Sequence, residues 1–258
     1  MATLYQALAH LEEIGGSGAL CTIIAAQGST PRQVGSKMLV YPGGAFAGTI
    51  GGGEMESRVL TVALQVIETE QPQTLEYSMT DPTRGDPGVC GGQLKIFVEP
   101  ILPKPLIVVV GAGHVGLEVV HLAKWLGYRV ALADDRAELC SPKKVPEADE
   151  YYPGPLQDLL ERLEFAPQTS FVLTTRNVEV DVAALPGILA RRVDYIGVIG
   201  SRRRWATTTA KLLEMGIDAD RIDAIHSPIG LNLKAETPRE IAVSILAEIM
   251  ALQKTKEY

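Results

Sequence analysis

Cysteines, aromatic residues and long apolar runs are all scarce in this sequence of 258 residues. Its three cysteines, Cys21, Cys90 and Cys140, lie far apart and form no C-x-x-C pair, which argues against a disulfide framework or a zinc knuckle. No apolar run approaches the ~20 residues that a membrane helix needs. Residues 1–5 carry none of the basic side chains that open a secretory signal. We therefore expect a cytoplasmic protein with no membrane partner.

Basic side chains are outnumbered as well, with 24 Lys and Arg against 31 Asp and Glu and a net charge of −7. Binding to a nucleic-acid backbone requires positive surface, so we expect no nucleic-acid partner. The hydrophobic and charged fractions, 46% and 21%, are ordinary for globular proteins and argue against disorder.

Glycine, in contrast, is abundant: the chain has 25 glycines, about 10% against a usual ~7%. Fifteen of them lie before residue 104. Three prolines, Pro100, Pro103 and Pro105, fix φ and remove amide donors, which predicts an extended connector. We therefore expect two domains, residues 1–103 and residues 104–258.

The spacing of apolar residues predicts an α/β fold. In residues 1–103 it predicts an α+β domain with a mostly antiparallel sheet, with helices over 3–14 and 54–69 and strands over 19–26, 38–41, 45–47 and 94–98. In residues 104–258 strands and helices alternate, which is typical of a Rossmann-like, doubly wound parallel sheet. The expected strands there are 106–110, 128–133, 170–174 and 195–199, and the expected helices are 115–126, 155–164, 178–190, 203–215 and 238–252.

The segment from Gly111 to Gly116 has the G-x-G-x-x-G spacing of a dinucleotide-binding loop, and it joins an expected strand to an expected helix. In such a loop Gly111 permits a tight turn, Gly113 lets the backbone approach a pyrophosphate, and Gly116 lets helix and strand pack closely. The amides at the helix start then face the phosphates. The alternative is a loop that serves packing alone. His114 either lines the phosphate site or caps the helix.

Two aspartates, Asp134 and Asp135, end the next expected strand. Either can accept hydrogen bonds from ribose hydroxyls, as the acidic residue of the fingerprint does. An acidic side chain at this position disfavours a 2′-phosphate, so NAD is preferred over NADP, although the neighbouring Arg136 keeps NADP open.

A second anion-type site is suggested by Gly200 and Ser201, which follow the expected strand 195–199 and precede three arginines at 202–204. Ser201 is suited to cap the helix. Arginines in a first turn oppose the helix dipole, an arrangement that makes sense beside an anion or an acidic partner. The alternative is a solvated basic face.

Three further glycine-rich motifs lie in the first domain: residues 27–37, 48–56 and 85–92. The first carries Arg32 and Lys37. The second places three consecutive glycines before a helix, where stacked amides can form an anion nest; its candidate residues are Gly51, Gly52, Gly53 and Glu56. The third holds Cys90 between glycines, either as an accessible thiol or as a small buried hydrophobe.

Together these motifs resemble the xanthine dehydrogenase accessory protein family (XdhC/CoxI). The resemblance covers nearly the whole chain and is carried by residues 28–38, 48–56, 90–92, 111–116, 134–136, 195–202, 228–232 and 236–242. It implies a chaperone that binds the molybdenum cofactor (molybdopterin), supports its sulfuration with a cysteine desulfurase, and helps insert it into a molybdenum hydroxylase such as xanthine dehydrogenase. It also implies a homodimer and a protein that is not itself an oxidoreductase.

Transferred by position, the resemblance places Cys90 at the cofactor, where its thiol can contact the molybdenum. It places residues 51–53, Arg32 and Lys37 near the anionic groups of the cofactor, with Glu56 in support. Two departures matter. Where relatives often have Thr-His-Asp, this chain has Thr-Arg-Asn at 175–177, and where the CoxI branch often has cysteine, it has Gly53.

Two other functions remain open. An NAD(P)-dependent oxidoreductase needs a general acid or base beside the nicotinamide, for which His226 is the best candidate. A nucleotide-sensing regulatory protein would need the loop at 111–116 alone. Between these and the chaperone, we favour the chaperone.

Overall fold

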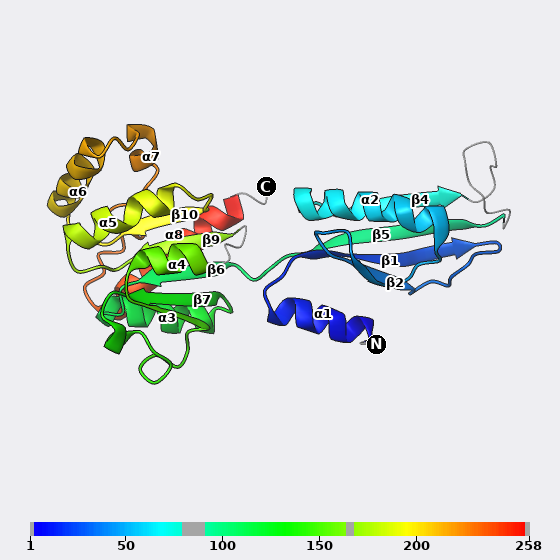
Figure 1. Ribbon diagram of the computed structural model, residues 1–258, viewed down its shortest axis with the longest axis horizontal. Coiled ribbons are helices and arrows are strands. Elements are labelled where there is room, and N and C mark those ends of the chain that lie inside the picture. Colours follow the sequence, from blue (N-terminus) through cyan, green and yellow to red (C-terminus); the bar gives the residue numbers. More distant parts are fainter. Residues whose placement is uncertain (1–2, 79–90, 164–167, 256–258) are drawn as a thin grey trace. The chain divides into compact units, whose positions relative to one another are not determined.

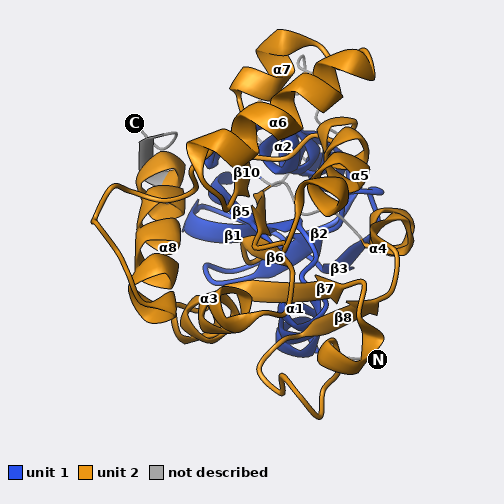
Figure 2. Cartoon of the chain, turned by 90° about the vertical axis from the view of Figure 1, so that its left-hand side faces the viewer, with its two compact units in different colours: residues 1–103 blue, residues 104–258 orange. Residues whose placement is uncertain are grey.

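The proline-rich connector lies between two separate sheets, because β5 (Gln93–Ile101) belongs to the first and β6 (Leu106–Val110) to the second. The computed structural model describes residues 3–78, 91–163 and 168–255. The chain divides at the connector into unit 1, residues 1–103, and unit 2, residues 104–258 (Figure 2). Each unit is described by itself below.

Unit 1 is built on an antiparallel sheet whose described strands have the order β3-β2-β1-β5-β4. Figure 1 shows α2 along one face of this sheet and α1 along the other. Besides β5, its elements are α1 (Leu4–Glu13), β1 (Gly18–Gln27), β2 (Lys37–Val40), β3 (Phe46–Gly48), α2 (Gly53–Thr69) and β4 (Gln73–Ser78).

Successive side chains of a strand point to opposite faces of the sheet. Met38 and Val40 of β2 are fully buried with Val59 and Ala63 of α2, in a core that also takes Ile96 of β5. Lys37 therefore points to the opposite face, against which α1 packs. The predicted antiparallel sheet and the two predicted helices of this unit are confirmed.

Unit 2 is a parallel sheet with the described strand order β10-β9-β6-β7-β8. From β6 the order runs outward in both directions, so the topological switch point lies between β6 and β9. Its other elements are α3 (His114–Trp125), β7 (Arg129–Asp134), η2 (Ala137–Leu139), β8 (Glu150–Pro153), α4 (Leu156–Arg162), β9 (Thr169–Leu173), α5 (Val178–Leu189), β10 (Tyr195–Val198), α6 (Arg202–Glu214), α7 (Ala219–Asp223) and α8 (Pro238–Thr255).

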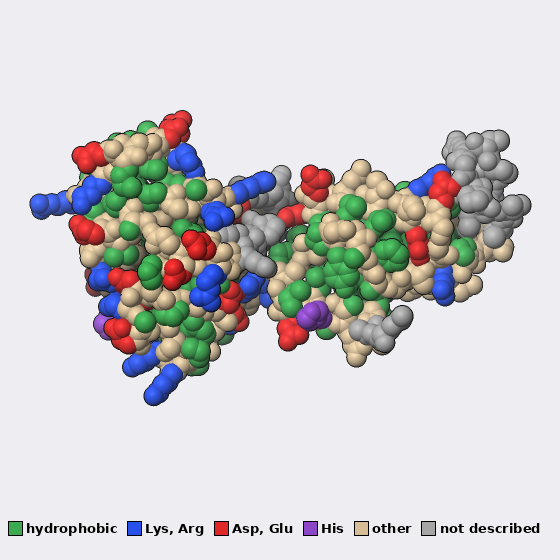
Figure 3. All heavy atoms as spheres, in the orientation of Figure 1, with side chains coloured by type: hydrophobic (Ala, Val, Ile, Leu, Met, Phe, Trp, Pro, Cys, Tyr) green, Lys and Arg blue, Asp and Glu red, His purple; other side chains and the backbone are tan. Residues whose placement is uncertain are grey.

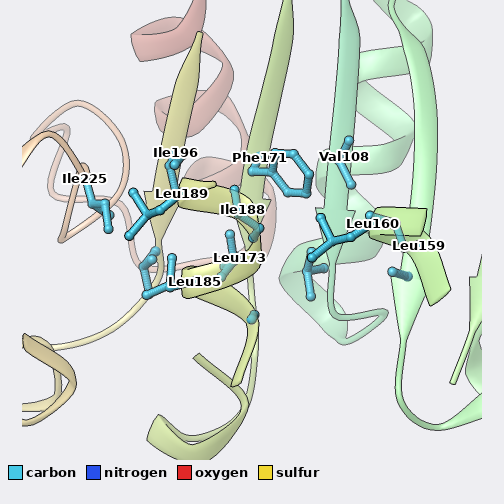
Figure 4. Packing of buried hydrophobic residues seen from close by; sticks show 14 of the residues in the cluster. Val108, Leu159, Leu160, Phe171, Leu173, Leu185, Ile188, Leu189, Ile196 and Ile225 are labelled. Carbon is cyan, nitrogen blue, oxygen red and sulfur yellow. The ribbon is translucent and has the colours of Figure 1, made fainter. Parts of the chain in front are cut away.

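Helices cover both faces of this sheet, as the doubly wound prediction requires. On one face Phe171 of β9 lies among Val108 of β6, Leu160 of α4 and Ile188 of α5 (Figure 4). On the other face α3 packs against β6 and β7, and α8 packs against α3 and adds its buried side chains to the same core. All five side chains of β6 are buried, which explains its unbroken apolar sequence.

Besides the short 3-10 helix η2, two strands and one α-helix of the described residues escaped the sequence prediction. β4 is an edge strand whose apolar alternation is limited to two side chains, Leu75 and Tyr77, which is too short to mark a strand clearly. β8 has four residues and lies at the other sheet's edge. α7 has five residues, too few for helical periodicity to show.

Candidate functional site

The loop between β6 and α3 is held tightly against the end of β9. Gly111 has φ +113°, and a Cβ added to it would lie 2.7 Å from the Thr174 carbonyl oxygen. A Cβ on Gly116 would lie 1.9 Å from the Gly111 carbonyl oxygen, so helix and strand approach too closely for any side chain. The Thr174 hydroxyl donates to the same Gly111 oxygen at 2.8 Å. Both glycines are thus required by packing.

The middle of this loop is open. Gly113 is the N-cap of α3, and a Cβ added to it would meet nothing within 4 Å. His114 is the first residue of the helix, is exposed, and does not cap it. The first amides of a helix have no carbonyl partner one turn back, so those of α3 point toward this open space.

Asp134, at the end of β7, is committed to holding the loop. Its carboxylate is buried. Oδ2 accepts hydrogen bonds from the Ala112 backbone N–H at 2.7 Å and from Arg136 Nη2 at 2.9 Å. Oδ1 accepts hydrogen bonds from the Arg136 backbone N–H at 2.9 Å and from Arg136 Nε at 3.0 Å. A carboxylate offers about four lone-pair positions, and all are used. Of the two aspartates predicted to bind a ribose, this one has no acceptor left.

Asp135 is exposed and forms a bidentate ion pair with Arg176, with both N–O distances 2.6 Å. The Arg176 guanidinium lowers the pKa of the Asp135 carboxyl by hydrogen bonding and by charge. The two residues line a pocket of ≈ 320 Å³ at the carboxyl edge of the sheet, together with Val110 and Asp134 beside the 111–116 loop. In the sequence Arg176 stood out solely as a departure from the family pattern. Its place just after the expected strand 170–174 was the signal that it reaches this crevice.

Ser201 caps α6, since its hydroxyl accepts the Arg204 N–H at 3.2 Å, and Gly200 before it has φ +153°. Of the three arginines that follow, Arg204 forms an ion pair with a carboxylate of the chain itself. Its guanidinium bonds the carboxylate of Asp181 at 2.6 and 3.1 Å, and Asp181 is fully buried in α5. The basic first turn is therefore explained in part by an internal ion pair that sequence reasoning missed. Arg202 and Arg203 are exposed.

His226 lies beside β10. Its backbone bridges Gly197 in β10, and its ring stacks on Tyr195 with centroids 4.7 Å apart. Its Nδ1 lies 3.6 Å from Glu248 of α8. Because β9 separates β10 from β6, the two strands are about 10 Å apart. The role of His226 as a proton donor beside a nicotinamide stays a prediction.

In unit 1 the described parts of the three glycine-rich motifs meet, the third being represented by Gly91 and Gly92. Ser29 bridges Gly91, and a Cβ on Gly28 would lie 3.0 Å from the Gly91 carbonyl oxygen. A Cβ on Gly92 would lie 2.3 Å from the Ser29 carbonyl oxygen. The 27–37 loop also reaches the 48–56 loop, because a Cβ on Gly51 would lie 2.9 Å from Pro31 Cγ.

The glycines at 51–53 all have positive φ, from +70° to +145°, which L side chains rarely adopt. Added Cβ atoms on Gly52 and Gly53 would meet nothing within 4 Å, so these backbone groups border open space before α2. Glu56 folds back over the loop: its Oε1 accepts the Ile50 N–H at 3.2 Å and the Thr49 hydroxyl.

The two predicted cations are placed differently. Arg32 is exposed, and its carbonyl accepts the Thr30 hydroxyl at 3.0 Å. The Lys37 ammonium donates to Thr22 at 2.9 Å, on the sheet face opposite α2. The Lys37 carbonyl, in contrast, accepts the Thr49 N–H at 3.0 Å and so helps to hold the 48–56 loop.

Cys90 lies outside the described residues. Cys21 and Cys140 are buried and form no disulfide. Burial raises the pKa of the Cys21 thiol to about 12 and also raises that of Cys140. Across residues 3–78, 91–163 and 168–255, no cluster of His, Cys, Asp and Glu is arranged to hold a metal ion. None of the helices within those ranges is both long and apolar enough to cross a membrane.

Models of known protein families match both units of the chain. The XdhC Rossmann domain matches residues 107–249, more than half of the chain, and the XdhC and CoxI family matches residues 11–78. The chain belongs to the XdhC family. The predicted resemblance is thereby confirmed, and unit 2 is an XdhC Rossmann domain.

Two curated relatives of this XdhC-family chain match it over less than half of their own length. YqeB of Escherichia coli K12, named as uncharacterized, is 32% identical over 255 residues, covering 97% of this chain and 46% of YqeB. A Bacillus subtilis protein named as a probable xanthine dehydrogenase subunit is 31% identical over 159 residues, covering 62% of this chain and 46% of that protein. The chain thus spans about half the length of these two relatives.

Two more distant relatives match along most of their length. The molybdenum cofactor insertion chaperone PaoD of Escherichia coli is 22% identical over 274 residues, covering 95% of this chain and 86% of PaoD. A crystal structure described as that of a xanthine dehydrogenase from Bacillus halodurans has a TM-score of 0.52 and 22% identity, covering 98% of this chain and 96% of that one. This second likeness bears on the fold alone.

Proposed function

We propose that this chain is an accessory protein in the maturation of a molybdenum hydroxylase, which binds the molybdenum cofactor as cargo and supports its sulfuration and insertion. The observation that carries the proposal is the meeting of the three glycine-rich motifs in unit 1. Gly91 and Gly92, which directly follow Cys90 in the chain, contact the 28–31 loop, and that loop contacts Gly51. Membership of the XdhC family and the name of PaoD support the same role.

The chemistry of these loops suits such a cargo. Molybdopterin carries a phosphate, and the open backbone at Gly52 and Gly53 offers amides to an anion. Arg32 is exposed and free to approach the same groups, whereas Lys37 enters the proposal through its backbone contact with the 48–56 loop. Cys90 is proposed as the thiol that contacts the metal end of the cofactor. Glu56 holds the loop in shape.

The test is to co-express the chain with the molybdenum-cofactor pathway and to measure the pterin that copurifies, by fluorescence after oxidation. We expect Cys90→Ala to lose at least about tenfold in bound pterin. Cys140→Ala is the matched control, because it removes a buried thiol from unit 2 and leaves unit 1 intact. Equal amounts of copurified pterin in wild type and Cys90→Ala would refute the role proposed for Cys90. The absence of pterin from every preparation would refute the proposal that the chain binds the molybdenum cofactor.

Partners follow from the same role: a hydroxylase such as xanthine dehydrogenase, a cysteine desulfurase, and a second copy of the chain. Unit 1 displays apolar side chains in the view of Figure 3, and Tyr5 is 70% and Phe46 48% exposed. Exposed apolar surface of this kind commonly marks protein contacts. Light scattering of the purified chain tests the homodimer, and copurification with a tagged desulfurase tests that partner.

A second proposed activity belongs to unit 2: binding of a nucleotide, NAD(P) or another, or of the phosphate-bearing part of the molybdenum cofactor. It is supported by the open space at Gly113 and the pocket beside the loop. Calorimetry with NAD and with AMP tests it. Heat with either would support a nucleotide site, and silence with both would exclude these nucleotides and leave the phosphate-bearing part of the molybdenum cofactor as the proposed ligand.

A further inference from the structure

The pocket beside the 111–116 loop has apolar walls and a charged mouth. Side chains from four elements or their ends form the walls: Val110, Ala133, Pro155, Leu156 and Val180. Its volume of ≈ 320 Å³ is at the lower end of the range for small-molecule sites. Walls of this kind suit an apolar or aromatic group, and the charged mouth suits a polar group attached to it.

Arg176 is the one basic side chain in the described lining of this pocket. Its partner Asp135 is 41% exposed and Arg176 itself is 46% exposed. Exposed ion pairs contribute little to stability, because water competes for both ions. The Asp135–Arg176 pair can therefore open at small cost when a better anion arrives. A phosphate is such an anion, because the planar guanidinium binds it bidentately.

The other charges at the mouth are already committed. Asp134 is saturated by the loop and by Arg136, and Glu179 is paired with Lys211 at 3.3 Å. Neither carboxylate pairs with Arg176, and Arg136 is tied to Asp134 through both its backbone and its side chain. Asp135 is thus the carboxylate that a ligand anion must displace.

We infer that this pocket takes a phosphate-bearing ligand whose apolar or aromatic part lies against its walls, and that Asp135 competes with the ligand phosphate for Arg176 instead of binding a ribose. Nucleotides and phosphorylated pterins share this chemistry. The inference rests on the ligand-binding activity proposed for unit 2 and is independent of the maturation role. It reverses the expectation from sequence, in which an acidic side chain at the end of β7 favours a ribose diol and disfavours an additional phosphate.

Calorimetry on the full chain tests the inference with two matched pairs of probes, AMP against adenosine and neopterin phosphate against neopterin. In wild type we expect the phosphate-bearing member of at least one pair to bind more tightly than its bare counterpart. Asp135→Asn should tighten that binding about two- to fivefold, the worth of an exposed ion pair, and leave the bare compound unchanged. Arg176→Gln should weaken the phosphate-bearing probe about tenfold. Arg221→Gln, an exposed arginine on α7, is the matched control and should change nothing.

The direction in which Asp135→Asn changes the affinity for the phosphate-bearing probe distinguishes a competing aspartate from a ribose-binding one. A ribose-binding aspartate would make this variant bind AMP more weakly, and that result overturns the inference. Equal affinity of wild type and Arg176→Gln overturns it too, as does the absence of binding by every probe to both wild type and Asp135→Asn. AMP binding alone identifies a nucleotide site, and neopterin phosphate binding alone identifies a phosphopterin site. Failure to activate a client hydroxylase would count against the maturation role and would leave these affinities as they are.

Discussion

Arg204 clamps the loop that carries Arg176, and its removal should destabilise unit 2. Its guanidinium donates to the Thr175 carbonyl at 3.0 Å and hydroxyl at 2.7 Å, and to the Asn177 carbonyl at 3.1 Å, so it grips both neighbours of Arg176. It also neutralises Asp181, whose side chain is 0% exposed. Arg204→Gln would leave that carboxylate buried without its cation.

Removing one partner of a buried ion pair typically costs 3–5 kcal/mol. The Arg204 side chain is 20% exposed, so water can recover part of the loss, and we expect a decrease of about 3 kcal/mol in the free energy of unfolding. For a unit of this size that corresponds to a fall of roughly 6–12 °C in Tm. The exposed neighbour provides the control, since Arg203→Gln should change stability by less than about 0.5 kcal/mol.

Urea unfolding followed by tryptophan fluorescence is the assay. Both tryptophans of the chain, Trp125 and Trp205, belong to unit 2, so the signal reports on that unit. Trp125 is 78% exposed, whereas Trp205 packs against the core beside Arg204 and should dominate the change. A result in which Arg204→Gln unfolds at the same urea concentration as Arg203→Gln would refute the clamp.

The loss of unfolding free energy in Arg204→Gln should also depend on pH. Burial raises the pKa of the Asp181 carboxyl, and the hydrogen bonds from Thr175 and Arg204 oppose that rise. Without Arg204 the folded-state pKa should rise further. A carboxyl whose pKa is raised by folding favours the folded state when protonated and opposes it when ionised. The difference between Arg204→Gln and wild type should therefore shrink as the pH falls from neutrality toward about 5, and adding Asp181→Asn should restore part of the stability at neutral pH.

Two further predictions follow from the packing of the loop and of the cysteines. Gly116→Ala should lower the urea midpoint strongly, because its Cβ would meet the Gly111 carbonyl. Gly113→Ala has nothing within 4 Å of its Cβ and should lower the midpoint only slightly, because alanine is a poorer N-cap than glycine. Equal midpoints for the two variants would contradict the loop geometry. At pH 8, alkylation followed by mass spectrometry should leave Cys21 and Cys140 unmodified in the folded chain and modify both in urea, because burial holds both thiols protonated; rapid labelling of Cys21 without denaturant would contradict its burial.

Much of the architecture was present in the sequence because local patterns carry it. The unbroken apolar run 106–110 predicted a strand buried on both faces, and β6 has those bounds. The glycine spacing at 111–116 predicted a turn from strand to helix, and the positions of Gly111 and Gly116 exclude any side chain. These features depend on backbone conformation and on burial, which neighbouring residues specify.

Tertiary structure alone decided which side chains face the candidate sites. The two adjacent aspartates after β7 have the same chemistry, yet Asp134 holds the loop and Asp135 pairs with Arg176, 41 residues further along the chain. Likewise, Lys37 directly follows a glycine-rich loop in the sequence, but the alternation of β2 turns its ammonium to the sheet face opposite α2, toward Thr22. Hydrogen-bond partners distant in the chain are set by how strands and helices pack, and no local pattern in this sequence records that arrangement.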